Sequence, residues 1–272
     1  MAGYEEFKAD PEFDSRIIPS FASADPRYFG FVIILRIWLR QINPPKGQDQ
    51  FTARNASNSP KVALRWTHAS WVHFKEKFIR VVLGTWDQAF LLSPPDTYDG
   101  FVWPEQGGKR RDLLCGLYVK LIDSERDNPH AVLNVVRLAD PTVHFGADST
   151  LLASNDVDGF PHGSVAAGVK WKQHPAAHEV GHLLGLHHVA QKSVACRNDF
   201  FKCYGSNLAE RVNIMGAGDQ LSLDNASPWR DRIFRHTGID ADKWKVDWAS
   251  GAAMLRGTES YERIPNPKLI DI

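Results

Sequence analysis

The segment HEVGHLLGLHH, residues 178–188, contains four histidines and one glutamate in eleven positions. On an α-helix, residues four apart lie one turn above the other on the same face, so His178 and His182 can direct two imidazoles at one metal ion. Glu179 lies beside this pair, where its carboxylate can accept a proton from a water activated by the metal. The spacing therefore predicts a helical metal site with a neighbouring general base.

A third ligand is expected from the chain just beyond the helix. Gly185 follows His182 by three residues, and glycine readily adopts the left-handed backbone conformation that ends many helices. The resulting reversal brings His188 back toward the metal. Three neutral imidazoles and one water form the open tetrahedral arrangement of a catalytic zinc ion, whereas a structural zinc ion has four protein ligands. We therefore expect Glu179 as the catalytic base and three Zn²⁺ ligands, His178, His182 and His188.

The remaining histidines carry a weaker signal. His187 is adjacent to His188, so the two side chains leave the backbone in different directions and only one of them can easily reach the metal. His174 precedes Pro175, the expected first residue of the helix, and is therefore expected outside it. A histidine that stands alone more often packs or faces solvent than binds a metal, and this applies to His68, His73, His130, His144, His162 and His236.

Residues 178–188 resemble the HExxHxxGxxH signature of the metzincin clan of zinc endopeptidases. Members of that clan also have a turn containing a methionine below the metal. In VNIMGAG, Met215 follows His188 by 27 residues and is flanked by glycines that suit a turn. The resemblance implies that Met215 is a hydrophobic floor under the zinc and not a ligand. The alternative is a core methionine that fills an irregular gap.

Among the metzincin subfamilies, the chain is most similar to the pappalysins. The similarity lies in LNVVRL, in HEVGHLLGLHH and in the cysteines that follow. One position departs from the pattern, because pappalysins, astacins and serralysins usually carry a tyrosine two residues after the methionine. This chain has Ala217 there, so tyrosine assistance to the transition state is not expected.

The resemblance implies a zinc-dependent endopeptidase that acts on protein or peptide substrates. The zinc ion lowers the pKa of its bound water to about 7, and Glu179 takes the proton and later passes it to the leaving amine. The substrate is expected to lie extended along an edge strand within Ser149 to Lys170, bonded through its backbone.

Three alternatives to this function remain open at the level of sequence. The first is a zinc amidase acting on cell-wall peptides or another non-protein amide. The second is a non-catalytic, zinc-stabilised binding module, against which Glu179 and the open fourth position argue. The third is a gluzincin-type site with Glu210 as the last ligand, which the presence of His188 after Gly185 disfavours.

Hydrophobic periodicity predicts the elements that surround the site. Short apolar or alternating runs predict strands at 29–39, 61–66, 112–122, 130–138, 149–154 and 163–171. The polar stretch 40–61 predicts a loop or linker. A helix is predicted at 71–92, with one apolar face made of Phe74, Phe78, Val81, Val82, Trp86 and Phe90. Another helix is expected from Pro175, and a last one at 227–238, with Ser227 as N-cap and Gly238 as its stop.

Strands, an early helix and a second helix that carries the histidines favour an α+β fold. The resemblance implies a metzincin-like catalytic domain at 61–250. Its upper subdomain, 61–188, is expected to have a mixed, twisted sheet and two main helices. Its lower subdomain, 189–250, is expected to be smaller and mostly irregular, with a C-terminal helix. Residues 1–60 then form an N-terminal extension of unknown role, and 251–272 form a tail.

Composition excludes several other classes of protein. A chain of 272 residues with 43% hydrophobic and 24% charged residues has enough apolar material for a core and is not a disordered tail. Lys+Arg and Asp+Glu both number 32, and this balance argues against a general nucleic-acid binder, which needs a basic excess.

The N-terminus and the cysteines bear on where the protein works. The acidic first 20 residues lack the cationic and apolar regions of a signal peptide, and the apolar run 29–39 is too short to span a membrane and carries Arg36. We therefore expect a protein that works inside the cell or leaves by a non-standard route. Cys115 is expected to be a buried free thiol, and Cys196 and Cys203 are expected either as a disulfide or as two free thiols.

Overall fold

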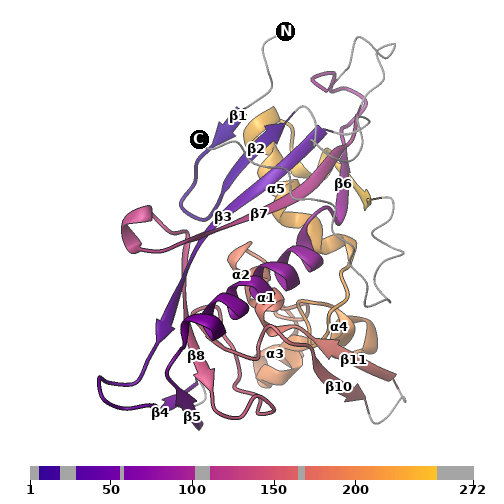
Figure 1. Ribbon diagram of the computed structural model, residues 1–272. Coiled ribbons are helices and arrows are strands. Elements are labelled where there is room, and N and C mark those ends of the chain that lie inside the picture. The colour runs from indigo at the N-terminus through magenta and orange to yellow at the C-terminus, as the bar shows by residue number, and fades with distance from the viewer. Residues whose placement is uncertain (1–5, 19–28, 56–57, 102–110, 165–168, 250–272) are drawn as a thin grey trace. The chain divides into compact units, whose positions relative to one another are not determined.

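The computed structural model describes residues 6–18, 29–55, 58–101, 111–164 and 169–249 (Figure 1). The strands are β1 (Glu6–Lys8), β2 (Asp14–Ile18), β3 (Phe29–Ile42), β4 (Gln50–Arg54), β5 (Pro60–Leu64), β6 (Phe90–Ser93), β7 (Leu113–Ile122), β8 (Ala131–Leu138), β9 (Leu151–Ala153), β10 (Phe160–Ser164), β11 (Val169–Gln173) and β12 (Lys245–Trp248). The α-helices are α1 (His68–Trp86), α2 (Pro175–Leu183), α3 (Val194–Asn198), α4 (Leu208–Val212) and α5 (Ser227–Thr237). Short 3₁₀ turns occur at Glu125–Asp127, Phe200–Tyr204, Leu223–Ala226 and Ala241–Lys243.

The described residues form five α-helices and both parallel and antiparallel strand pairs. This combination confirms the α+β class. The chain forms two compact units, and β3 and β7 have residues in both. The first unit comprises Met1–Leu35, Trp86–Tyr118 and Ser222–Ile272, and the second comprises Arg36–Thr85 and Val119–Leu221. None of the helices that the structure describes is long and apolar enough to cross a membrane.

The first unit is held together by antiparallel strand pairs and by α5. Strand β2 pairs with β1 and with the start of β3, and β6 pairs with β7 and β12. On α5, the buried Arg232 donates to the Asp10 carboxylate at 2.7 Å and to the Ser15 hydroxyl at 3.0 Å. Trp229 donates from Nε1 to the Gly116 carbonyl at 2.8 Å. These buried bonds fix α5 within its own unit.

The second unit contains the histidine helix. Strand β8 pairs in parallel with the end of β3 and with β9, and antiparallel with β5, which in turn pairs with β4. One apolar cluster of these strands and their loops consists of Ala53, Ala63, Val136, Leu138, Phe145 and Ala153. Strands β10 and β11 form a separate antiparallel hairpin immediately before α2.

Helix α2 is short and mostly buried. Pro175 is its first residue and His174 is its N-cap, as expected for a proline that needs no hydrogen-bond acceptor in the first turn. The next N–H, that of Ala176, donates to the carbonyl oxygen of Asp156 at 3.0 Å. The buried apolar residues Ala176, Ala177 and Val180 lie within the helix and anchor it in the second unit. This anchoring positions the histidines.

Most predicted elements are present, and three details of the prediction were wrong. The predicted loop 40–61 contains strand β4, whose outward residues are polar and mask the alternation. Phe90 lies in β6 and not on the helix, because the chain leaves α1 through Gln88, which has a φ of 55°. The helix α5 has Ala226 as its N-cap, so Ser227 is its first residue, whereas Gly238 ends it with a φ of 69°.

Two other predictions fall partly or wholly on residues that the structure does not describe. The predicted strand 163–171 corresponds to parts of β10 and β11, and residues 165–168 between them lie outside the described residues, as does the predicted tail 251–272. The expected domain boundaries, with an extension at 1–60, remain predictions.

Candidate metal centre

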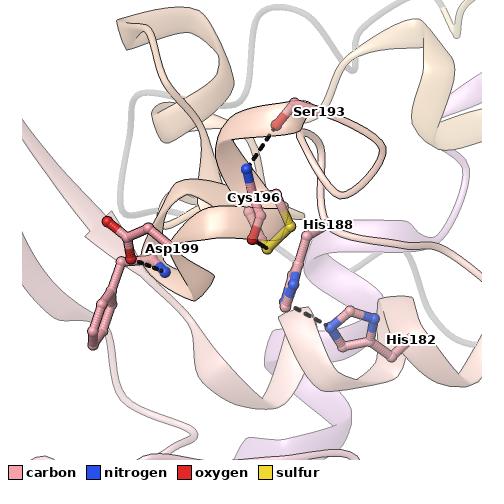
Figure 2. The surroundings of a disulfide bond; sticks show 7 residues. His182, His188, Ser193, Cys196 and Asp199 are labelled. Carbon is pink, nitrogen blue, oxygen red and sulfur yellow. Dashed lines mark hydrogen bonds between the residues drawn. A yellow bond between two sulfur atoms is a disulfide. The ribbon is translucent and has the colours of Figure 1, made fainter.

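Three imidazoles of the second unit converge on one point. The Nε2 atom of His188 lies 3.2 Å from Nε2 of His178 and 3.1 Å from Nε2 of His182. In Figure 2 the ring of His188 is directed at that of His182, and the dashed line joins these two nitrogens. One ligand atom from each of the three residues lies within 4.8 Å of the other two. The geometry therefore brings together three histidines that can hold a metal ion.

Hydrogen bonds to the backbone determine which ring nitrogen of two ligands faces the centre. Nδ1 of His178 donates to the carbonyl oxygen of Ile214 at 2.6 Å, and Nδ1 of His182 donates to that of Leu186 at 2.8 Å. A carbonyl only accepts, so both Nδ1 atoms carry the proton and both Nε2 atoms present a lone pair. A proton on Nε2 of His188 could satisfy only one of these lone pairs, whereas a metal ion satisfies all three nitrogens.

All three imidazoles are suited to the neutral, metal-binding form. Burial lowers the pKa of His178 to about 3 and that of His188 to about 4, with the neighbouring imidazoles adding to both shifts. Burial also lowers the pKa of His182. Because a protonated imidazole cannot bind a metal, these shifts keep the ligands available at neutral pH.

The reversal after α2 occurs at Gly185. Its φ is 88°, in the left-handed region that glycine adopts without steric cost. The N–H of Gly185 donates to the carbonyl of His182 at 2.9 Å, and the N–H of Leu186 donates to that of Gly181 at 3.0 Å. The chain then runs back so that His188 faces the two helical ligands, as the spacing predicted.

The turn around Met215 packs against the ligand segment. Met215 is buried, and its carbonyl accepts from the N–H of Val189 at 3.2 Å, next to His188 in the chain. Glycine is required on both sides of Ala217. A Cβ on Gly216 would lie 2.1 Å from the Glu210 carbonyl oxygen, and one on Gly218 would lie 2.0 Å from that of Val212. The methionine therefore lies in a tightly packed turn whose backbone contacts the segment that carries His188.

Glu179 is buried on α2 between the two helical ligands. Burial raises the pKa of its carboxyl to about 8, and the negative charges of Asp148 and Asp156 add to the shift. A cation held by the three histidines would oppose this shift, because a positive charge favours the ionised carboxylate. The site thus places a carboxyl with a strongly perturbed pKa beside a potential metal position.

Three residues that the sequence does not favour as ligands, His187, His174 and Glu210, lie outside the histidine cluster. His187 is exposed, and His174 is the N-cap of α2. Glu210 accepts from the N–H and hydroxyl of Ser206, at 2.7 and 2.9 Å, and is not part of the metal-binding group of described residues. The gluzincin-type alternative therefore receives no support from the geometry.

Sequence reasoning missed Tyr204, whose ring lies beside the metal centre. Its centroid is 4.1 Å from that of His188 and 5.8 Å from that of His178. Burial raises the pKa of the Tyr204 hydroxyl, and the charge of Glu179 adds to the shift. The signal available in the sequence was indirect: Tyr204 directly follows Cys203, which forms a disulfide with Cys196 (Figure 2).

The cysteines are settled by the structure. Cys196 and Cys203 form a disulfide, which the sequence left open, and Cys115 is a buried free thiol as expected.

No protein-family model, no curated protein and no solved structure matches this chain.

Proposed function

We propose that this chain is a zinc-dependent endopeptidase of the metzincin type. The observation that carries the proposal is the convergence of three imidazole nitrogens, at 3.1 and 3.2 Å, together with a buried carboxyl on the helix that bears two of these imidazoles. Three protein ligands leave one position for water or substrate, which is the arrangement of a catalytic rather than a structural metal. A non-catalytic binding module would need neither the open position nor Glu179.

The donor set favours zinc. Zinc binds imidazole at about 2.0–2.1 Å in tetrahedral geometry, which places ligand nitrogens roughly 3.3 Å apart. Nε2 of His188 lies at nearly this spacing from Nε2 of His178 and from Nε2 of His182. Imidazole also binds copper, iron and nickel, so metal analysis is part of the test below.

A zinc ion held by His178, His182 and His188 would supply Lewis acidity for the scissile carbonyl and a water of lowered pKa. Glu179 accepts the proton of that water as its oxygen bonds to the carbonyl carbon. The carboxyl then returns the proton to the nitrogen of the leaving amine as the carbon–nitrogen bond breaks. Water has then been added across the peptide bond, and Glu179 is ionised again.

The turn and the hairpin add support for a metzincin-type site. Gly185 turns the chain toward the third proposed ligand, and the carbonyl of the buried Met215 accepts from the N–H of Val189, next to His188. Trp171 of β11 donates from Nε1 to the carbonyl of Ala217 at 2.9 Å, so the hairpin that precedes α2 contacts the same turn. We expect the extended substrate to bond along a strand within Ser149 to Lys170, a window that contains β9 and β10.

Metal analysis and cleavage-site mapping test this proposal together. The purified full chain should contain about one zinc per molecule and cleave peptide bonds in a mixed-sequence peptide library, read by mass spectrometry. Glu179→Ala should retain the metal and cleave nothing, because the carboxyl acts as a base and not as a ligand. Turnover that survives in this variant removes Glu179 from the mechanism. Hydrolysis of a muramoyl-peptide amide without cleavage of the library would favour the zinc amidase.

A further inference from the structure

The aromatic ring of Tyr204 lies against the candidate metal centre on the side formed by His188. Its centroid is 4.1 Å from the His188 ring, and its plane is inclined by only 21° to that of His178. The side chain is half-buried. Within the part of the chain that the structure describes, its other ring contact is with Phe200, at 5.7 Å, and its hydroxyl has no hydrogen-bond partner. A hydrogen-bond donor therefore remains available next to the ligands.

The backbone of Tyr204 is fixed on three sides. The preceding residue, Cys203, is bonded to Cys196, and its carbonyl accepts from the N–H of Ala190 at 3.1 Å. The turn around Met215 lies so close that a Cβ on Gly216 would be 2.7 Å from the carbonyl oxygen of Tyr204. A restrained backbone and ring contacts on both sides reduce the ordering that the side chain must undergo before it donates a hydrogen bond, which is what makes a preorganised donor effective.

Peptide hydrolysis creates a need for such a donor. When water adds to a carbonyl carbon, negative charge develops on the carbonyl oxygen, and fixed donors aimed at this oxyanion stabilise the transition state. The turn around Met215 cannot supply a hydroxyl, because Ala217 stands where a tyrosine would be expected. Tyr204 reaches the same centre from a different segment, the one closed by the disulfide.

We propose that Tyr204 is a catalytic residue whose hydroxyl donates a hydrogen bond to the oxyanion formed at the scissile carbonyl. This inference rests on the proposed peptidase function. The phenol keeps its proton throughout, so Glu179 remains the group that carries the proton from water to the amine. The ring itself has a separate role, which is to pack against His188.

The variant Tyr204→Phe separates the hydroxyl from the ring. It should retain one zinc and the folded state, with kcat lower by about 100-fold and KM nearly unchanged, because the lost bond exists only in the transition state. A second measurement needs no turnover: binding of a phosphinic peptide, whose tetrahedral anion resembles the oxyanion, should weaken by a similar factor. Tyr118→Phe, on β7, removes a hydroxyl elsewhere and should change neither quantity.

The outcomes distinguish this inference from the function on which it depends. Values of kcat and of phosphinate affinity within about twofold of the wild type refute the role of the hydroxyl while the peptidase stands. Loss of zinc from Tyr204→Phe also refutes it, because the hydroxyl would then act in holding the site. A wild-type chain that neither cleaves peptides nor binds the phosphinate refutes the proposed function and this inference with it.

Discussion

Nδ1 of His178 donates to the carbonyl oxygen of Ile214 at 2.6 Å, and this bond joins the helix that carries two of the clustered histidines to the residue immediately before Met215. It uses only the backbone of the turn, so it holds the tautomer and direction of a ligand independently of the methionine side chain. Groups that orient a metal-binding imidazole in this way raise its basicity and affect metal affinity. The turn around Met215 thus has two separable roles, one through its backbone and one through packing.

Substitution of Met215 tests this separation. Met215→Leu conserves volume and should lower the free energy of unfolding by less than about 1.5 kcal/mol, while Met215→Ala leaves a cavity and should lower it by about 2–5 kcal/mol. Both variants should keep one metal per chain, because Ile214 still accepts from His178. Denaturant unfolding and metal analysis give the two numbers. A metal-free but stable Met215→Leu variant would show that the side chain itself holds the site.

The choice of His188 as third ligand is tested by three single variants. His188→Ala should lose most of the bound metal and essentially all peptide hydrolysis, since two imidazoles make a much weaker site. His187→Ala and His174→Ala should keep the metal, because His187 is exposed and His174 is the N-cap of α2. Metal content and hydrolysis are measured on all three. If His187→Ala loses the metal while His188→Ala keeps it, the ligand assignment is wrong.

Alanine substitutions at Gly185 and at Gly84 can be compared to test whether the turn after α2 requires a left-handed backbone conformation. A Cβ at either position would meet nothing within 4 Å, but only Gly185 has a positive φ, of 88°. Gly185→Ala should therefore lower stability by roughly 1–2 kcal/mol through backbone strain alone, and it should weaken metal binding by displacing His188. Gly84→Ala, inside α1, should raise stability by roughly 1 kcal/mol, because alanine is the better helix former.

Thermal unfolding with and without added zinc measures both effects of these glycine variants. Gly185→Asn is the graded control, since asparagine tolerates the left-handed region better than alanine. It should fall between the wild type and Gly185→Ala. Equal stability of the wild type and Gly185→Ala would contradict a conformational requirement at this turn.

The parts of the site that depend on local spacing could be predicted from the sequence, and the parts that depend on distant contacts could not. Positions four apart place His178 and His182 on one helical face, and a glycine three residues later predicts the turn to His188. Tyr204 has no such spacing, because its position depends on a disulfide and on the turn around Met215. The structure shows these contacts directly, whereas the sequence left open whether Cys196 and Cys203 form a disulfide or are two free thiols.

The distinction between local pattern and distant contacts also explains which strands and helix ends were predicted wrongly. The predicted strands 29–39 and 112–122 correspond to β3 and β7, because the buried residues of these strands alternate or run continuously in the sequence. Strand β4 was missed, because its pairing with β5 stabilises a segment whose own residues are mostly polar. The end of α1 was placed too late, because Gln88 leaves the helix in a left-handed conformation that no glycine or proline announces.

Asp87, at the end of α1, predicts a pH dependence of stability that is separate from the metal centre. Burial raises the pKa of its carboxyl from 3.8 to about 6, against hydrogen bonds from Leu117 and Gln88 that lower it. Because the folded-state pKa is the higher one, the protonated carboxyl stabilises the fold. This stabilisation is complete below about pH 3.8 and is lost as the pH rises through about 6.

Asp87→Asn removes the ionisation and keeps an oxygen that can accept from the N–H of Leu117, as Oδ1 of Asp87 does at 2.8 Å. Relative to the wild type, the variant should therefore gain stability between pH 4 and pH 7, by roughly 2–3 kcal/mol. Urea unfolding in the presence of a chelator measures this difference without a contribution from metal binding. The exposed Asp123→Asn serves as the control for the same carboxylate-to-amide change at the surface. A stability difference for Asp87→Asn that stays constant with pH would mean that the Asp87 carboxyl ionises as readily in the folded chain as in the unfolded one.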